Sequence, residues 1–362
     1  MRLLYIVQNF RQGQGGTPES IRLMARRLAR LGFVSDAYDG TALFENVEQL
    51  DVLPEDRADR PLFDPKHAQK YDAIFVVGPW QNPQMLFSVL RYSGHKQIVY
   101  LPRGGLADNE FAGRRNLKKH IYFPLVEARI LRASTTIVFS SELEMTHSGR
   151  LARFFNKHLI VPDLFDLPEA VPAVTRQTPR LSFLAELDPR KGAAELMSGL
   201  ATWADSSDMA IDVTIGGGLR PGREAYFAKV RALADALEVP PVNFLGPVAH
   251  QDRAAFYAET DIFIVPSQFE SYCLTALEAI SNGCIVICGA NIGVLEYLPR
   301  HPAIVRLSDL SPCAIMGGIE QALVWQRSTT DPRSVVRDMA KHAIGAINNQ
   351  AEGLWENLLR NE

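Results

Sequence analysis

Residues 266–283 read Pro-Ser-Gln-Phe-Glu-Ser-Tyr-Cys-Leu-Thr-Ala-Leu-Glu-Ala-Ile-Ser-Asn-Gly and lie between two short apolar runs, Asp261–Val265 and Cys284–Cys288. Both runs are rich in β-branched residues, which predicts buried strands. Between them a helical pattern extends from Leu274 to Ser281, and Asn282-Gly283 is typical of a left-handed helix end. The sequence therefore predicts an α/β unit. Open α/β sheets bind ligands at the carboxyl ends of their strands, where this helix would begin.

This unit contains two carboxylates, Glu270 in the loop and Glu278 in the helix, with seven residues between them. Helical side chains lean toward the N-terminus, so Glu278 can reach a ligand over the loop, and the first helical amides attract phosphate. A nucleotide-sugar offers hydroxyl groups on both sides of a diphosphate and fits this pattern. The structural alternative is that Ser267 and Glu270 form a capping box and Glu278 is an ordinary helix-face carboxylate. These residues alone support both interpretations equally.

With this Glu-x7-Glu element the chain resembles the retaining GT-B glycosyltransferases of family four, within group 1. Further stretches are similar to that family: Leu181–Gly192, Ile211–Gly218, Val242–Val248, Gln14-Gly15-Gly16 and Leu101–Leu106. The resemblance covers nearly the whole chain and is more specific in the C-terminal half. It implies an α/β protein with the GT-B fold, in which two Rossmann-like, doubly wound parallel-sheet domains face a central cleft.

The domain organisation follows from length and from the alternation of strand and helix signals. A chain of 362 residues suits two domains, and the alternation predicts mainly parallel sheets. A proline-rich stretch near residues 161–179 reads as a linker. We expect an N-terminal acceptor-binding domain over 1–165, a C-terminal donor-binding domain over 166–340, and a helix over 341–362 that crosses back to the N-domain, as the resemblance implies.

Individual elements are predicted from local patterns. The expected strands of the first half are Leu3–Phe10, Ala73–Val77, Gln97–Leu101 and Thr135–Ser140; the expected helices are Pro18–Leu31 and, at the end of the chain, Asp331–Leu359.

The resemblance assigns roles to particular residues. Glu270 would hold the hydroxyl groups of the transferred sugar, Lys191 and Arg103 would stabilise the departing diphosphate, and Glu278 would anchor the ribose. The leaving phosphate oxygen would take the acceptor proton. The donor-binding set is Gly15, Gly16, Arg190, Lys191, Pro247, Val248, Glu270, Ser271, Tyr272, Cys273, Leu274 and Glu278. Residues 1–165 would choose the acceptor, including Asn9, Trp80-Gln81-Asn82 and the loop Gly104–Phe111.

One residue departs from the family pattern. The family usually carries an arginine five residues before the lysine, and this chain has Glu186 there. A desolvated carboxylate facing a diphosphate would be repulsive by roughly several kcal/mol. We expect Arg103, or else Arg190, to supply the missing charge. The alternatives are that Arg103 is a loop arginine paired with Asp108, or that the donor site is damaged.

Composition and missing motifs exclude several classes. The chain has no Asp-x-Asp, His-Glu-x-x-His or Gly-x-Ser-x-Gly pattern, and Gly216-Gly217-Gly218 lacks the dinucleotide spacing. Four cysteines without CxxC spacing predict reduced thiols. We therefore expect no metal and no cofactor. With no apolar run near the roughly 20 residues of a spanning helix, residence in the cytoplasm or at the inner face of the membrane is expected.

Charge is uneven along the chain. Residues 1–165 carry 22 Lys and Arg against 17 Asp and Glu, a net of +5, and the remainder carries 16 against 24, a net of −8. Basic residues gather in two helical stretches: Arg22, Arg26, Arg27 and Arg30; and Arg114, Arg115, Lys118 and Lys119 with Arg129 and Arg132. Each alone suits a solvated face. Together they suggest contact with an anionic bilayer or an anionic acceptor.

These observations predict a retaining, metal-independent hexosyltransferase that moves a sugar from a nucleotide-diphosphate-sugar to an acceptor hydroxyl. The acceptor would be a glycan, a lipid-linked molecule or a small molecule in bacterial glycan, polysaccharide or glycolipid synthesis; no nucleic acid partner is expected. Two alternatives stay open. One is another GT-B enzyme, such as a sugar-phosphate synthase or a nucleotide-sugar epimerase. The other is a non-catalytic nucleotide-sugar-binding partner of an active transferase.

Overall fold

The structure is a computed structural model and describes residues 1–8, 10, 16–40, 42–50, 69–81, 96–111, 117–169, 171–174, 176–207, 209–220, 222–237 and 240–360. The chain divides into two compact units. The N-terminal unit comprises Met1–Asp166 and Ala346–Glu362, and the C-terminal unit comprises Leu167–Gly345.

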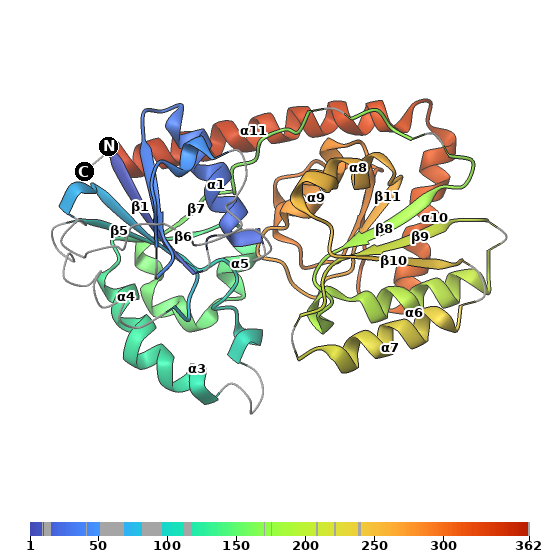
Figure 1. Cartoon of the computed structure of the whole chain (residues 1–362), viewed down its shortest axis with the longest axis horizontal. Helices are drawn as coiled ribbons and strands as arrows, with labels where there is room; N and C mark the ends of the chain where they lie inside the picture. The colour runs from blue at the N-terminus through green and yellow to red at the C-terminus, as the bar shows by residue number, and fades with distance from the viewer. Residues whose placement is uncertain are drawn as a thin grey trace. The chain divides into compact units, whose positions relative to one another are not determined.

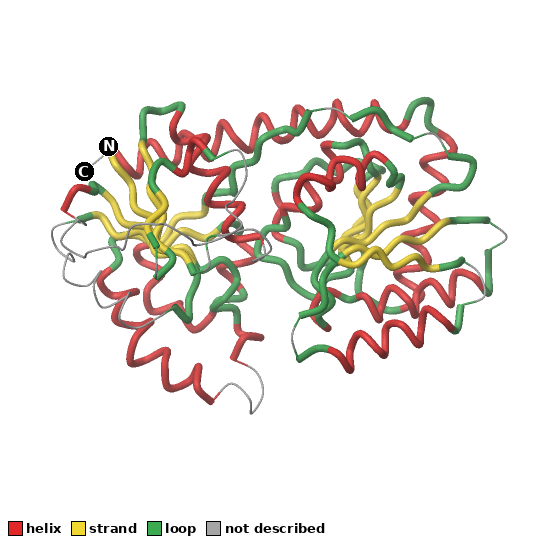
Figure 2. The backbone as a smooth tube through the Cα atoms, in the orientation of Figure 1, coloured by secondary structure: helices red, strands yellow, loops and turns green. Residues whose placement is uncertain are grey.

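The N-terminal unit is built on a seven-stranded sheet of order β3-β2-β1-β4-β5-β6-β7 (Figures 1 and 2). Its strands are β1 (Arg2–Val7), β2 (Val34–Tyr38), β3 (Leu43–Phe44), β4 (Ala73–Val77), β5 (Gln97–Leu101), β6 (Thr136–Phe139) and β7 (His158–Ile160). All pairings are parallel except β2 with β3. The predicted bounds of β4 and β5 are confirmed. The prediction that the first strand reaches Phe10 was wrong, because pairing with β4 ends at Val7.

Two hydrophobic cores cover the two faces of this sheet, because successive side chains of a strand point to opposite faces. Leu3, Tyr5 and Val7 of β1 pack with α1 (Gly16–Ala29) and the end of α11 (Pro332–Arg360). The intervening Leu4 and Ile6 pack with the helical run 117–133 on the other face. Figure 1 shows these helices on opposite sides of the strands.

The helical run 117–133 consists of α3 (Leu117–Tyr122), a π-helical segment (Phe123–Glu127) and α4 (Ala128–Ala133). Pro124 lies inside the π-helical segment. Since proline has no N–H to donate within a helix and its ring crowds the preceding turn, a local change of helix type is expected there. The α-helix that follows β6 is α5 (Glu142–Thr146), and Ser141 caps it by accepting from the Glu144 N–H.

Two arginines of the basic stretch on α1 are held by partners within the N-terminal unit. Arg22 is only 3% exposed, and its guanidinium donates to Glu19 one turn earlier and to the Leu50 carbonyl at 3.0 Å. Arg27 donates to Glu352 of α11 at 2.7 Å. Arg22 and Arg27 therefore hold the N-terminal unit together, whereas the Arg30 side chain is 61% exposed.

The C-terminal unit has a six-stranded, fully parallel sheet of order β10-β9-β8-β11-β12-β13 (Figure 2). The strands are β8 (Arg180–Leu184), β9 (Asp212–Gly216), β10 (Val242–Gly246), β11 (Ile262–Val265), β12 (Ile285–Cys288) and β13 (Ile304–Arg306). The helices are α6 (Ala193–Ala204), α7 (Glu224–Asp235), α8 (Arg253–Ala258), α9 (Leu274–Ser281) and α10 (Pro312–Ser328). The predicted doubly wound, parallel sheets are confirmed. In each sheet the strand order reverses at one place, between β1 and β4 and between β8 and β11, which is where such sheets bind ligands.

Helix α11 contributes to both units. Its residues up to Gly345 belong to the C-terminal unit, and those from Ala346 belong to the N-terminal unit. There the Asn348 amide bonds to both backbone groups of Phe165, at 3.0 and 2.8 Å. The ring centroid of Trp355 lies 5.6 Å from that of Phe75 on β4. The predicted helix over Asp331–Leu359 is confirmed.

Candidate functional site

Two of the three residues predicted as catalytic meet where the C-terminal sheet reverses its order. Lys191 ends the short 3-10 helix Pro189–Lys191 after β8, and Glu270 lies in the loop after β11. The Lys191 Nζ donates to Glu270 Oε1 at 2.6 Å, and the Ser267 hydroxyl donates to the same oxygen at 2.7 Å. The geometry therefore unites the basic loop and the Glu-x7-Glu element in one constellation.

The electrostatics of the pair keep the ammonium charged. Desolvation of Lys191 opposes its protonation, but the charge of Glu270 and the hydrogen bond to it outweigh that effect and raise the pKa of Lys191. Both side chains are partly open to solvent, with 28% of Lys191 and 18% of Glu270 exposed. A ligand can therefore reach a fixed cation beside a carboxylate that accepts hydrogen bonds.

Backbone contacts fix the loop that carries Glu270. The Gln268 N–H donates to the Arg190 carbonyl at 2.9 Å, which ties this loop to the loop after β8. The Glu270 N–H donates to Asn291, and the Glu270 carbonyl accepts from Gly293 at 3.0 Å. Gly192, at φ 76°, permits the close approach, because a Cβ there would lie 1.9 Å from the Pro266 carbonyl oxygen. The site is thus held rigidly on three adjoining loops.

The start of α9 rules out the capping-box interpretation. The helix begins at Leu274, and no side chain caps it. The Ser267 hydroxyl instead binds the Glu270 side chain, several residues before the helix. Cys273 occupies the cap position with φ 98° and ψ 78°, a strained backbone for a residue that is not glycine. Burial raises the pKa of its thiol to about 12, so the thiol stays protonated and the backbone is the part suited to a ligand.

Glu278 is not an unpartnered helix-face carboxylate. Its two oxygens accept from Arg253 Nη1 at 2.9 Å and from the Tyr257 hydroxyl at 2.8 Å, both on α8. Reasoning from the sequence missed these two partners. Their spacing of four residues, which places both on one side of a helix just before β11, was the available signal.

A second set of charges lies beside Lys191. The buried Asp188 accepts from Arg190 Nε and from Arg223 Nε, each at 3.0 Å, and Arg220 Nη1 lies 3.8 Å away. These contacts lower the pKa of Asp188, against the desolvation that would raise it. Glu186 has an exposed side chain. Arg220 and Arg223 were not predicted; their place just after the Gly216–Gly218 turn was the signal.

The other predicted residues of this unit lie on adjacent loops. Pro247 and Val248 follow β10, and a Cβ at Gly218 would lie 3.6 Å from Pro247. Tyr272 is buried, with its ring centroid 5.8 Å from that of Tyr297. Ser271 and Leu274 flank the strained Cys273.

The predicted residues of the N-terminal unit that the structure describes follow the strands β1, β4 and β5. Gly16 is the first residue of α1, whereas Gly15, Asn9 and Asn82 lie outside the described residues. Arg103 follows β5 with φ 51° and forms an ion pair with Asp163. The alternative that it pairs with Asp108 was therefore wrong, because its partner comes from the segment after β7.

Two buried glutamates hold strained loops at this sheet edge. Trp80, after β4, has φ 67°, and its N–H donates to Glu127 Oε1 at 2.8 Å. The Gly104 N–H, next to Arg103, donates in the same way to Glu144. Burial raises the pKa of Glu127 to about 7 and also raises that of Glu144. Bulky residues with positive φ are retained where the surroundings enforce them, as at binding sites.

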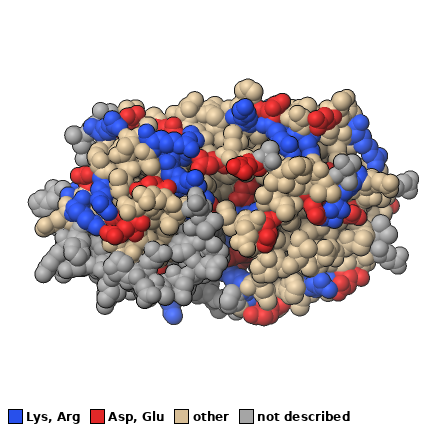
Figure 3. Space-filling view, turned by 45° about the horizontal axis from the view of Figure 1, so that its top comes forward, with Lys and Arg blue, Asp and Glu red and all other residues tan. Residues whose placement is uncertain are grey.

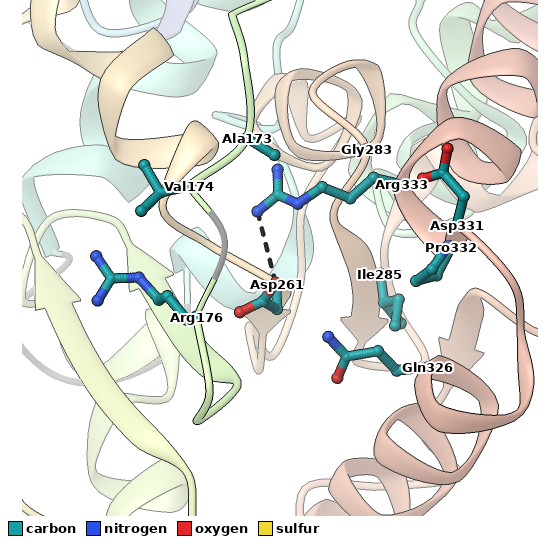
Figure 4. Close-up of a pocket in the computed structure, with 10 residues that line it drawn as sticks. All are labelled: Ala173, Val174, Arg176, Asp261, Gly283, Ile285, Gln326, Asp331, Pro332 and Arg333. Carbon is teal, nitrogen blue, oxygen red and sulfur yellow. Dashed lines mark ion pairs between the residues drawn. The ribbon is translucent and has the colours of Figure 1, made fainter.

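A pocket of 350 Å³ in the C-terminal unit lies elsewhere. It sits at the start of β11 and β12, the sheet edge opposite Lys191 and Glu270. Figure 4 shows Arg333 reaching Asp261 across it, with the two charged groups 3.7 Å apart. None of the predicted site residues lines this pocket.

Two features are absent from the part of the chain that the structure describes. No group of three or more His, Cys, Asp or Glu side chains there is arranged to hold a metal ion. No helix among those residues is both long and apolar enough to cross a bilayer.

Comparisons with known proteins bear on this site. Residues 171–302 match the family model of glycosyl transferases group 1. A stretch of 117 residues is 35% identical to the D-inositol 3-phosphate glycosyltransferase of Corynebacterium glutamicum (strain R), covering 32% of this chain and 28% of that relative.

Solved structures match over the full length. Sucrose-phosphate synthase from Thermosynechococcus elongatus has a TM-score of 0.73 at 17% identity over 100% of both chains. HepE from Anabaena, solved with UDP and glucose, has a TM-score of 0.73 at 17% identity over 98% of this chain and 100% of that one. The chain therefore has the GT-B fold, and its residues 171–302 are similar to the glycosyl transferases of group 1.

Proposed function

We propose that the protein is a retaining glycosyltransferase of family four, which moves a sugar from a nucleotide-diphosphate-sugar to an acceptor hydroxyl. The observation that carries the proposal is the Lys191–Glu270 pair, with its 2.6 Å contact at the point where the sheet order reverses. It lies inside the segment that matches the group 1 family. A GT-B structure solved with UDP and glucose supports a nucleotide-sugar donor.

The roles of the residues follow from their chemistry. Lys191 neutralises the charge that grows on the leaving diphosphate, and such preorganised stabilisation is the largest contribution in many enzymes. Glu270 accepts hydrogen bonds from hydroxyl groups of the transferred sugar. Glu278, oriented by Arg253 and Tyr257, accepts from the ribose. The leaving phosphate oxygen takes the acceptor proton on the same face, so the anomeric configuration is retained and no protein base is needed.

We propose that transfer is independent of a divalent metal, because Lys191 supplies the charge that a metal supplies in other transferases. The acceptor would be a glycan, a lipid-linked molecule or a small molecule, and the product a bacterial polysaccharide, glycan or glycolipid. These statements extend the family assignment and rest on the resemblance of the site.

We also propose that the N-terminal unit associates with an anionic bilayer surface. Leu117, Ile121 and Leu125 are 67, 55 and 53% exposed and lie four residues apart on the run 117–133. The same run exposes Lys118, Arg129 and Arg132. Figure 3 shows Lys and Arg interspersed with Asp and Glu on the face in view. The proposal rests on the exposed apolar row of the run 117–133. Apolar residues flanked by cations are the pattern of interfacial helices.

Vesicle flotation tests the membrane proposal. Leu117→Ser combined with Ile121→Ser should reduce binding to anionic vesicles by about tenfold or more, given the loss of roughly 25 cal/mol per Å² of buried apolar area. Val324→Ser is the matched control, because Val324 on α10 is 62% exposed. Equal binding by the double variant and the control would refute the proposal.

A donor screen tests the activity itself. The full-length chain is offered UDP-, GDP- and ADP-sugars, and nucleotide release is measured with and without EDTA in the presence of a panel of sugar acceptors. We expect release with one donor class, unaffected by EDTA and abolished in Lys191→Ala. Nucleoside diphosphate binding without release from any donor would support the non-catalytic alternative and refute the proposal. Absence of both release and binding would refute the two together.

A further inference from the structure

Three arginines surround one buried carboxylate in the C-terminal unit. Asp188 is 1% exposed, whereas the side chains of Arg190, Arg220 and Arg223 are 44, 48 and 40% exposed. Arg190 comes from the loop after β8, and the other two come from the loop after β9. A backbone bridge between Leu187 and Leu219 joins the two loops. The convergence is thus fixed by the sheet and does not depend on surface rotamers alone.

The charge of this cluster is unbalanced. Three guanidinium groups and one carboxylate leave a net charge of +2 within a few ångströms. Asp188 is fully occupied by its partners, since it also accepts from the Arg190 N–H at 3.1 Å. Like charges held together repel unless an anion neutralises them. Guanidinium groups bind phosphate in a planar, two-pronged manner, which makes a phosphate group the anion of choice.

The way the arginines are held leaves their outer ends available. Arg223 contacts Asp188 through Nε at 3.0 Å, which is the inner nitrogen of its guanidinium. Its terminal nitrogens belong to a side chain that is 40% exposed. Arg220 approaches the same carboxylate only at 3.8 Å. Asp188 therefore orients Arg223 without consuming the face that a phosphate would bind.

The position of the cluster relates it to the donor site. Arg190 directly precedes Lys191, and the charge of Arg190 acts on the Lys191 ammonium. All these groups lie on loops that leave the same edge of the parallel sheet. Glu186, which stands where the family usually has an arginine, has an exposed side chain, and its backbone carbonyl accepts from the Asp188 N–H at 2.9 Å.

We propose that Arg190, Arg220 and Arg223, oriented by Asp188, form a phosphate-binding cluster that supplies the charge lost by the presence of Glu186. This inference rests on the proposed function and assigns the diphosphate of the donor to residues of two loops. Asp188 acts as a positioning residue. The charge is supplied within the C-terminal unit, and Arg103, occupied by Asp163, is not needed for it.

Inorganic pyrophosphate is the probe, because its binding does not depend on the base, the sugar or turnover. Titration calorimetry of the full chain should show that Arg220→Ala and Arg223→Ala each weaken pyrophosphate binding by about tenfold or more, the effect of one charge-assisted contact. Arg231→Ala is the control, since Arg231 on α7 is also 44% exposed and pairs with a carboxylate, Asp235. Equal affinities of all three variants and the parent would overturn the proposal.

The variant Asp188→Asn tests whether pyrophosphate binding depends on the orientation of the arginines or only on the net charge of the cluster. Asparagine also caps a helix, so the loop should fold. The change makes the cluster more positive, and a purely electrostatic site would then bind pyrophosphate more tightly. We expect weaker binding, because the arginines lose the carboxylate that orients them. Unchanged or tighter binding would overturn the positioning role of Asp188.

Competition identifies the source of the phosphate. If the cluster serves the donor, UDP, GDP or ADP displaces pyrophosphate, and the displacing nucleotide weakens in Arg223→Ala. If glucose 6-phosphate displaces pyrophosphate and none of the nucleotides does, the cluster serves a phosphorylated acceptor and the donor assignment is overturned. Pyrophosphate binding that depends on the cluster in a protein without transferase activity would refute the proposed function while leaving the anion site standing.

Discussion

Lys191 Nζ and Glu270 Oε1 lie 2.6 Å apart on loops that follow β8 and β11, the two strands between which the sheet order reverses. Each group sets the environment of the other. The carboxylate keeps the partly desolvated ammonium charged, and the ammonium holds the carboxylate in place through the 2.6 Å hydrogen bond. A change in either residue therefore alters both.

Glu270→Gln should lower turnover by about a hundredfold or more, in the range for loss of one key polar contact in a transition state. It should also move the alkaline limb of the pH profile to lower pH. The reason is that Lys191 then keeps its desolvation but loses the charge that raises its pKa. Steady-state kinetics from pH 6 to 10 measure both effects. Glu169→Gln, at an exposed position, is the control. A pH–rate profile of Glu270→Gln that is lower but has its alkaline limb at the same pH would contradict the coupling between Glu270 and Lys191.

Glu278→Gln should weaken nucleoside diphosphate binding while changing turnover at saturating donor much less, because the ribose contact is made in both ground and transition states. Tyr257→Phe removes one donor to Glu278 and leaves the Arg253 contact at 2.9 Å, so its effect on nucleotide affinity should be smaller. Calorimetry gives the affinities. If Tyr257→Phe equals or exceeds Glu278→Gln, the carboxylate does not itself contact the nucleotide.

Cys273 should show an inverted preference between glycine and alanine. Inside a helix alanine is favoured over glycine by roughly 0.5–1 kcal/mol. At φ 98° the order should reverse, with Cys273→Gly more stable than Cys273→Ala by about 1 kcal/mol. Chemical denaturation measures the difference. The same two substitutions at Thr275, inside α9, should give the ordinary order; the same order at both positions would show that Cys273 is not strained.

Glu127 should make stability depend on pH near neutrality. Its pKa is about 7 in the folded protein against 4.5 for the ordinary carboxyl, so the folded state holds a proton that the unfolded state releases between these values. Stability should then fall as pH rises from about 4.5 to 7 and level off above, by an amount of order 3 kcal/mol. Denaturation of Glu127→Gln should lack this contribution. An identical pH dependence in the variant and the parent would contradict the assignment.

Much of the fold could be predicted because it depends on local patterns. The strands β4 and β5 and helix α9 begin and end where their apolar runs, turn residues and Asn282-Gly283 indicate. The first strand was overextended, because its end depends on pairing with β4 rather than on its own composition. The burial of Arg22 was missed for the same reason, since it depends on the distant segment whose Leu50 carbonyl accepts from Arg22 at 3.0 Å.

The residues of the candidate site also fall into those that local sequence patterns predict and those that depend on tertiary contacts. Lys191 and Glu270 could be predicted because each belongs to a motif that is continuous in the sequence. Arg220 and Arg223 could not, because their role arises only when the loop after β9 meets Asp188 in the loop after β8. Arg103 shows the converse. The motif around Arg103 was visible in the sequence. Its ion-pair partner Asp163, however, lies 60 residues away and comes close only in the folded chain.

Helix α11 gives the N-terminal unit two separate stretches of chain, Met1–Asp166 and Ala346–Glu362. A fragment cut after Asp166 would lose Trp355 from its core and the amide of Asn348 from the backbone of Phe165. Any exchange of this half between relatives, by evolution or in the laboratory, must therefore carry the tail with it. Two crossover points are needed, and inheritance of Met1–Asp166 alone through a single recombination event would leave an incomplete core.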